Sequence, residues 1–409
     1  MPDFSPFAGV RYSGEPAALA ALVAPPYDVI DEDERAALEA ADAHNSVRLI
    51  LPRDQSQPGD RYEAAATRFR EWMSSGVLAR DPSPRLYTYR MDFKDAQGKP
   101  RHTRGVLGAL RLPEVDHHDV LPHERTMAKA KSDRLALLSA MRVNVDPIWG
   151  LTLGRGLSER LGGEESIATC LDPDGVSHAL GAVDDPAAIA EVREIVASAP
   201  LVLADGHHRF ETALNYRNQR RADGIDDPGA ASILALVAEL ADDELWIEPI
   251  HRLVELPPGV DLRVRLADAF LVSDAGPNSP EGIDELVGRM RTERGLGLVD
   301  ARGLALAVPR AEMRGAALAG EHPAVAATDA AIIEALVVPR LPGATWDYRH
   351  DARAVAALVE KGAANAAILC SPVSVAETRA AAVDRVRMPQ KTTFFWPKPR
   401  TGMVFRTLD

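Results

Sequence analysis

Five consecutive residues after an apolar run carry the most chemistry in this sequence: Asp205, Gly206, His207, His208 and Arg209. The apolar residues 201–203 predict a buried strand, and residues 212–221 predict a helix. Polar groups are thereby placed at a helix N-terminus, where unpaired N–H groups and the helix dipole favour an anion. We expect a phosphate or a carboxylate to bind here, with Gly206 and Arg209 contributing to the site.

The acidic and imidazole side chains of this motif allow several roles. Asp205 could orient a histidine, act as a general base, or bind Mg²⁺ together with Glu211. His207 and His208 are catalytic candidates, either for proton transfer or as a phosphohistidine. Zinc is not expected, because no spacing in the chain matches a zinc signature. The alternative is a capped helix, in which Asp205 bonds the first turn and both histidines face solvent.

A second polar segment, residues 116–134, precedes and enters a predicted helix. In it Glu124 is a candidate catalytic base. Arg125 and Lys129 are four residues apart and would share one helix face, where two cations repel unless an anion lies between them. They are therefore candidates for phosphate binding. The alternative is a solvated helix in which these charges pair along the surface, with Asp133 among the partners.

Both ends of the chain hold further candidates. Residues 388–398 are extended and aromatic, and their candidate phosphate donors are Lys391, Thr392 and Thr393. Near the N-terminus two prolines stiffen the turn before Asp28, a candidate catalytic carboxylate. The chain has seven lysines among 47 basic residues, and four of them lie in two short segments, Lys129 and Lys131 in one and Lys391 and Lys398 in the other. A lysine kept in an arginine-rich chain suggests a place that needs a compact ammonium. We expect these segments and the Asp205 motif to form one anion-binding pocket.

The pattern of the chain predicts a mixed α/β fold. Residues 85–93 and 105–111 predict a hairpin, residues 186–198 a helix, and residues 47–51 a short strand. At about 100–200 residues per domain, 409 residues correspond to two or three domains. We expect a catalytic, phosphate-binding domain over residues 1–255 and a C-terminal α/β domain over residues 256–409, whose tail returns to the site.

Composition limits the class of protein. A net charge of −13 argues against non-specific binding to nucleic acid, which needs a broad basic surface. The two cysteines, Cys170 and Cys370, share no motif, and no apolar stretch has the length of a membrane span. No secretory leader is recognised at the N-terminus. A cytoplasmic protein without a membrane partner is expected.

Together these motifs resemble a family of uncharacterised bacterial and archaeal proteins, domain of unknown function 1015. The resemblance extends over nearly the whole chain, on residues 25–30, 123–126, 133–135, 204–209, 251–252, 388–393 and 397–398. Thr392 and Trp396 depart from it, since serine and tyrosine are expected there. Residues 205–209 are also similar to a signature of the ParB/sulfiredoxin superfamily, which includes free-serine kinases. That resemblance implies a ParB/sulfiredoxin-like nucleotide-binding core, with ATP or ADP as cofactor.

The favoured hypothesis is a nucleotide-dependent kinase of a small hydroxy compound such as serine, with Mg²⁺, because phosphoryl transfer needs clustered cations and a base. One alternative is a phosphohydrolase, metal-assisted or using a phosphohistidine. Another is a non-catalytic ParB-like nucleotide-binding module. The expected partner is a small anionic or phosphorylated substrate; a homodimer stays open, and nucleic acid is not expected.

Overall fold

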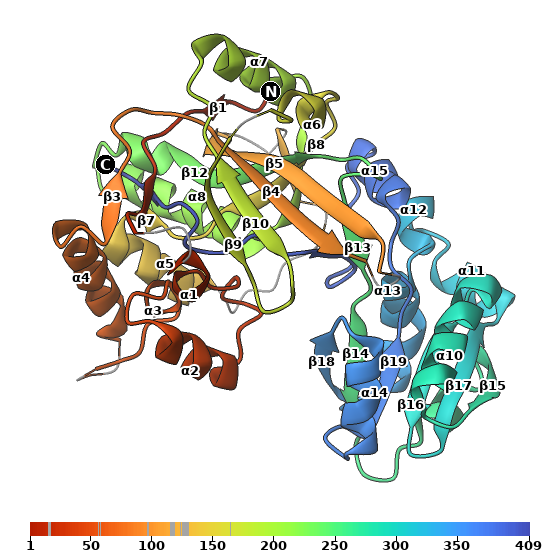
Figure 1. Ribbon diagram of the computed structural model, residues 1–409. Helices are drawn as coiled ribbons and strands as arrows, with labels where there is room; N and C mark the ends of the chain where they lie inside the picture. The colour runs from red at the N-terminus through yellow and green to blue at the C-terminus, as the bar shows by residue number, and fades with distance from the viewer. Residues whose placement is uncertain are drawn as a thin grey trace. The chain divides into compact units, whose positions relative to one another are not determined.

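The computed structural model describes the chain except residues 15–17, 56, 58, 96–97, 115–118, 123, 125–130 and 164, and only the backbone of residues 131–132. Two compact units emerge (Figure 1). Unit 1 comprises Met1–Pro122, Thr126–Trp246 and Pro397–Asp409, and unit 2 comprises His123–Arg125 and Ile247–Trp396. This division describes packing, and the domain boundary expected near residue 255 stays a prediction.

Unit 1 contains a large mixed sheet with the strand order β6-β11-β8-β12-β5-β4-β10-β9, and β1 pairs with β5. Strand β11 is parallel to β6 and β12 is parallel to β8, whereas β11 is antiparallel to β8. The strands are β1 (Phe4–Ser5), β4 (Tyr87–Lys94), β5 (Pro100–Arg111), β6 (Val120–Pro122), β8 (Ile148–Thr152), β9 (Ser166–Leu171), β10 (Ser177–Gly181), β11 (Leu201–Asp205) and β12 (Ser232–Glu239). The expected hairpin is confirmed as β4 and β5.

Helices and short ladders complete unit 1. The helices are α1 (Leu19–Leu22), α2 (Glu32–Ala41), α3 (Val47–Ile50), α4 (Arg61–Ser74), α5 (Lys131–Met141), α6 (Leu157–Arg160), α7 (Pro186–Ala197), α8 (His207–Ala222) and η3 (Pro228–Ala231). The short strands are β2 (Val10–Tyr12) paired with β3 (Leu78–Arg80), and β7 (Val143–Asn144) paired with β21 (Arg406–Thr407). Apolar residues of α7 and α8, such as Val192 and Phe210, share one core with Leu203 of β11. Burial of that stripe explains why these amphipathic segments are helical.

One predicted secondary-structure element is wrong. Residues 47–51 predict a strand, but Val47–Ile50 form a single helical turn, α3. The Asn45 side chain accepts a hydrogen bond from the Val47 N–H at 2.9 Å, and Val47, Leu49 and Ile50 are buried. A side-chain bond at the turn and burial of its apolar residues therefore override the weak strand preference of a short β-branched run.

Unit 2 has an antiparallel sheet in the order β15-β17-β16-β19-β14-β18, enclosed by helices (Figure 1). The strands are β14 (His251–Glu255), β15 (Phe270–Gly276), β16 (Leu296–Asp300), β17 (Gly303–Pro309), β18 (Thr345–Arg349) and β19 (Ala366–Leu369). The helices are α9 (Leu262–Leu266), α10 (Pro280–Glu293), α11 (Ala311–Ala317), α12 (Pro323–Ala326), α13 (Asp329–Ile332), η4 (Ile333–Val337), η5 (Val338–Arg340), α14 (Ala352–Glu360) and α15 (Val375–Val383). Strands β13 (Trp246–Glu248) and β20 (Phe394–Trp396) stand outside this sheet.

The two faces of the unit 2 sheet bury separate cores. On β16, Leu298 belongs to a core shared with Ile332 of α13, and the next residue, Val299, belongs to a core shared with Leu286 of α10. This alternation along one strand is typical of a sheet covered on both faces. The mixed α/β class is confirmed.

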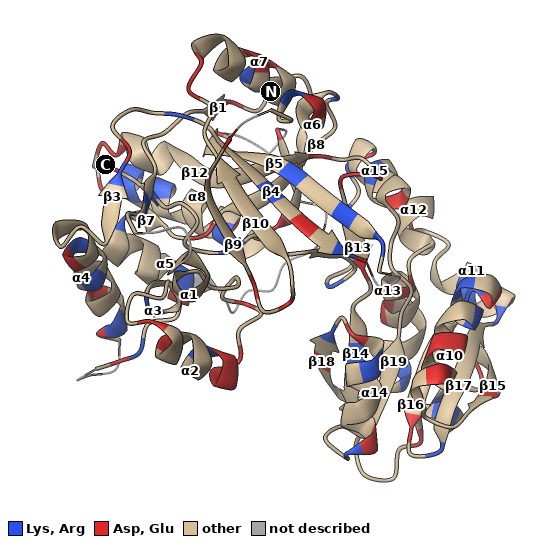
Figure 2. Ribbon diagram, in the orientation of Figure 1, with Lys and Arg blue, Asp and Glu red and all other residues tan. Residues whose placement is uncertain are grey.

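The surface helices carry mixed charge. In Figure 2, α4 and α10 each carry basic and acidic residues together, and on α10 Arg289 pairs with Glu293 at 2.9 Å. Such mixtures are typical of solvated helix faces. Within the described part of the chain, no helix combines the length and apolar character that crossing a bilayer requires.

Candidate functional site

The Asp205 motif forms the turn between β11 and α8 in unit 1. Helix α8 begins at His207, earlier than the expected residue 212, so both histidines lie in its first turn. Gly206 has φ +85°, and a Cβ there would lie 3.0 Å from Ile148 Cγ2 and 3.1 Å from Arg209 Nε. Both the left-handed backbone and the close neighbours require glycine at this position. The predicted strand, turn and following helix are confirmed, with the helix beginning five residues earlier than predicted.

Asp205 lies between two cations. Its carboxylate accepts a hydrogen bond from Arg209 at 2.8 Å and from Lys398 Nζ at 2.9 Å, and all three side chains are less than one-fifth exposed. Burial raises the pKa of Asp205, but the charges of Lys398 and Arg209 outweigh it and hold the pKa well below its usual range. Asp205 is therefore ionised, and each cation is fixed beside it. The expected return of the C-terminal tail to the motif is confirmed by Lys398.

Arg209 connects this turn to the strand beside it. One terminal nitrogen donates to Asp205 and another to the Pro147 carbonyl. Its Nε is buried and finds no hydrogen-bond partner among the residues that the structure describes. Burial lowers the pKa of Arg209, but nearby carboxylates, with Asp205 and Asp146 foremost, outweigh it and raise the pKa. The site thus contains a fixed guanidinium with one donor still available.

The turn near the N-terminus belongs to the same cluster. Asp28 is exposed, and its charge also raises the pKa of Arg209. The ring of Tyr27 lies 4.4 Å from the Arg134 guanidinium carbon, a cation–π distance. Burial raises the pKa of Tyr27 to about 12. The segments around Asp28 and Asp205, far apart in sequence, therefore act on each other electrostatically within unit 1.

Buried Asp146 completes the cluster. Its side chain accepts a hydrogen bond from the Thr401 hydroxyl, and burial raises its pKa. Sequence reasoning missed Asp146 because nothing in its neighbourhood marks it. It singled out Lys398 only as a lysine retained in an arginine-rich chain and did not name it as a partner of Asp205.

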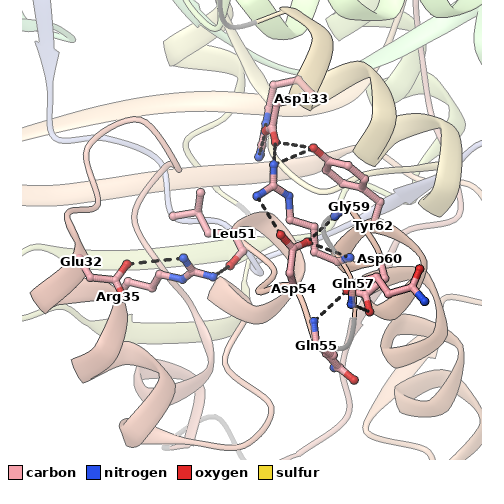
Figure 3. Close-up of polar contacts among 12 residues, drawn as sticks. Glu32, Arg35, Leu51, Asp54, Gln55, Gln57, Gly59, Asp60, Tyr62 and Asp133 are labelled. Carbon is pink, nitrogen blue, oxygen red and sulfur yellow. Dashed lines mark hydrogen bonds and ion pairs between the residues drawn. The ribbon is translucent and has the colours of Figure 1, made fainter.

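Asp133 has a structural role in the part of the second segment that is described. It accepts hydrogen bonds from Tyr62 at 2.8 Å and Arg61 at 2.9 Å (Figure 3). Arg134 also pairs with it and donates to the Ile50 carbonyl at 2.7 Å. These contacts join α4 to α5, which matches the surface-pairing alternative for this residue.

Glu124 lies in unit 2, where it meets the predicted phosphate donors. The N–H groups of Lys391, Thr392 and Thr393 donate to its carboxylate at 2.9, 3.1 and 2.9 Å. The Thr393 hydroxyl adds a fourth bond at 2.9 Å, whereas the Thr392 hydroxyl donates to the Pro389 carbonyl at 2.6 Å. Successive N–H groups of this kind make an anion-binding concavity, and here the anion is the protein's own carboxylate.

Lys391 shapes that concavity. Its φ of +57° is left-handed, which turns successive N–H groups toward one point. Arg252 donates to the Lys391 carbonyl at 3.0 Å, and both cations lie over the Tyr348 ring, at 5.3 and 5.8 Å from its centroid. The residues expected in one pocket are therefore described as two clusters, one in each unit. A single pocket stays a prediction.

The remaining predicted site residues lie either outside the described residues or at the start of α8. Arg125 and Lys129 lie outside the described residues. His207, His208 and Glu211 lie in the first two turns of α8, half-buried. Within the described ranges, no three His, Cys, Asp or Glu side chains form a group that could hold a metal. Mg²⁺ usually takes one or two carboxylates plus substrate phosphates, so its binding at Asp205 and Glu211 stays a prediction.

Comparison with known proteins gives a family but no activity. Residues 4–328 match a family described as "Protein of unknown function (DUF1015)". No curated protein matches the chain.

Similar solved structures are remote. A conserved hypothetical protein from Pyrococcus furiosus is 11% identical over 74% of this chain and 95% of its own, with a TM-score of 0.38. A free serine kinase in complex with AMP is 13% identical over 74% and 91%, with a TM-score of 0.38. SbnI with C-terminal truncation from Staphylococcus aureus is 9% identical over 72% and 85%, with a TM-score of 0.36. TM-scores below 0.5 do not support assigning the activity of any of these proteins to this chain.

Proposed function

The chain belongs to the DUF1015 family, and we propose that it is a nucleotide-dependent, Mg²⁺-assisted kinase of a small hydroxy compound. The observation that carries the proposal is the position of Asp205 between Arg209 and Lys398, at the N-terminus of a 16-residue helix. Helix N–H groups, a guanidinium and an ammonium are the donors that phosphate groups take.

The balance of charge around Arg209 favours phosphoryl transfer over a site that only binds an anion. A site of the latter kind needs an excess of cations, but here the carboxylates of Asp205, Asp146 and Asp28 surround Arg209. Phosphoryl transfer uses both signs, because cations neutralise the phosphates while carboxylates hold Mg²⁺ and accept the hydroxyl proton. The mixed cluster fits this set of tasks.

Individual residues suit different tasks. The free Nε of Arg209 and the first N–H groups of α8 would bind phosphate oxygens. Asp205, kept ionised by two cations, is a weak base and is better suited to hold Mg²⁺ or to fix those cations. Exposed Asp28 is then the candidate to accept the hydroxyl proton. Mg²⁺, when bound, would neutralise charge on the transferred phosphoryl group.

The test is incubation of the full chain with ATP or ADP, Mg²⁺ and a panel of hydroxy amino acids, with serine first because of the motif's resemblance. Phosphorus NMR and mass spectrometry would identify a phosphorylated acceptor. We expect Arg209→Ala to weaken nucleotide binding roughly 10- to 100-fold, because a charge-assisted contact is worth about 1.5–3 kcal/mol. The matched control is Arg221→Ala, at the other end of α8, where Arg221 makes an exposed pair with Glu114 at 2.6 Å.

The outcomes separate the alternatives. Cleavage of a phosphomonoester without transfer would replace the kinase with a phosphohydrolase. Nucleotide binding without turnover would favour a non-catalytic module. Unchanged nucleotide affinity in Arg209→Ala, with the control folded, would remove Arg209 from the site.

A further inference from the structure

The residues from Pro397 to Arg400, which carry Lys398, have no regular secondary structure. The nearest backbone bridge that follows, between Thr401 and Ala24, is three residues from Lys398, so the contacts of Arg400 lie closer to it. Arg400, two residues after Lys398, is buried at 8% exposure in unit 1. Its backbone N–H and its guanidinium each donate a hydrogen bond, to Tyr89 and to Asp172, and these two residues belong to one hydrogen-bond network.

Four residues close this network into a ring, which we call the Arg400 ring: Tyr89, Asp172, His178 and Arg400. The Arg400 N–H donates to Tyr89 Oη at 3.0 Å, and Tyr89 Oη lies 2.8 Å from His178 Nδ1. His178 Nε2 lies 3.0 Å from Asp172, which also binds the Arg400 guanidinium, with its Nε at 3.1 Å. The chain of bonds begins and ends on Arg400.

The protonation states of the ring agree with one another. Burial raises the pKa of Asp172, but hydrogen bonds from His178 and Arg400 outweigh it and lower the pKa, so the carboxylate accepts. Burial lowers the pKa of His178, which keeps the imidazole neutral. His178 Nε2–H then donates to Asp172, and Tyr89 donates its proton to Nδ1 while accepting from the Arg400 N–H. Loss of Arg400 would leave Asp172 without this cation and Tyr89 Oη without one donor.

We propose that the Arg400 ring is a positioning device that holds Lys398 against Asp205 for the phosphoryl-transfer site. The role in transfer rests on the proposed function, but the positioning of Lys398 does not. Tyr89, Asp172 and His178 touch neither Asp205 nor Arg209 through any of these bonds. They act through Lys398, by fixing the backbone two residues away.

The test compares Tyr89→Phe with Tyr87→Phe. Tyr87 lies on the same strand, is equally buried, and loses an equivalent hydroxyl, which bonds Asp81 at 2.6 Å and the Gly9 N–H at 2.8 Å outside the ring. Reductive methylation followed by peptide mass spectrometry would report the reactivity of all seven lysines separately. We expect Tyr89→Phe to raise the reactivity of Lys398 about fivefold, the effect of one net hydrogen bond, and Tyr87→Phe to leave it unchanged.

Activity supplies a second readout. If the ring acts through Lys398, Tyr89→Phe lowers kcat in the wild-type background but has little further effect on Lys398→Ala. Additive losses, or equal Lys398 reactivity in the two tyrosine variants, would overturn the proposal. A wild-type chain without phosphoryl transfer would defeat the proposed function alone, because the labelling experiment still judges the positioning of Lys398.

Discussion

Three half-buried carboxylates, Asp205 in unit 1 and Glu124 and Asp329 in unit 2, are neutralised in different ways. In unit 1, Asp205 is paired with the full charges of Arg209 and Lys398. In unit 2, Glu124 accepts backbone N–H groups from the tail, and Asp329 accepts the Ser371 N–H at 2.7 Å. Asp205 is neutralised by charged side chains, whereas Glu124 and Asp329 are held mainly by backbone N–H groups.

The consequence is visible in the direction of the pKa shifts. Burial dominates at Asp329, where the amide bond only partly offsets it, and the pKa rises to about 6. At Asp205 the cations outweigh burial, and the pKa falls. A side-chain cation that neutralises a carboxylate can also pair with a bound anion, whereas a carboxylate held by amides stays with its own chain. This contrast favours the unit 1 cluster as the reactive site and Glu124 as a clamp for the tail.

The largest effect is expected from Asp205→Ala. Two partly buried cations would lose their counter-charge, which should lower the free energy of unfolding by roughly 3–5 kcal/mol. Urea denaturation would measure it, with Arg221→Ala, which removes an exposed ion pair, as a control expected to have a much smaller effect. A loss as small as the control would mean that solvent already screens Asp205, and its contrast with Glu124 and Asp329 would disappear.

The next effect concerns pH and Asp329→Asn. Because the pKa of Asp329 is higher in the folded chain than its ordinary value of 3.8, its stabilising contribution is complete below about pH 4 and is lost as pH rises through 6. The wild type should lose roughly 3 kcal/mol relative to the asparagine variant over this range. Unfolding curves of both proteins at several pH values give that difference. A constant difference would mean that folding does not raise the pKa of Asp329, and its contrast with Asp205 would then lose its basis.

The smallest effect is expected from Glu124→Gln. The amide keeps one oxygen for the tail N–H groups but turns its NH₂ toward other donors, which should cost about 2 kcal/mol of stability. If Glu124 is a clamp, the measured kcat should fall only in proportion to the fraction of folded protein. Glu124→Asp is the charge-conserving comparison. A fall in kcat of several orders of magnitude in a fully folded variant would instead support the catalytic base expected from the sequence.

Local elements could be predicted because their causes are local. The strand, the glycine turn and the helix start around Asp205 follow from an apolar run, a residue tolerant of positive φ, and the spacing of apolar side chains on α8. The short helix at Val47 could not, because burial and the Asn45 side chain decided it.

The sequence by itself determined which residues can do chemistry and the turn that presents Asp205 and Arg209. Only the tertiary structure decided their partners, since Lys398 is 193 residues from Asp205 and Lys391 is 267 residues from Glu124. Periodicity specifies which face of a strand or helix is buried, but not which strand lies beside it. Partner choice depends on strand order and on the path of the tail, and these minimise the cost of burying charge across the whole chain.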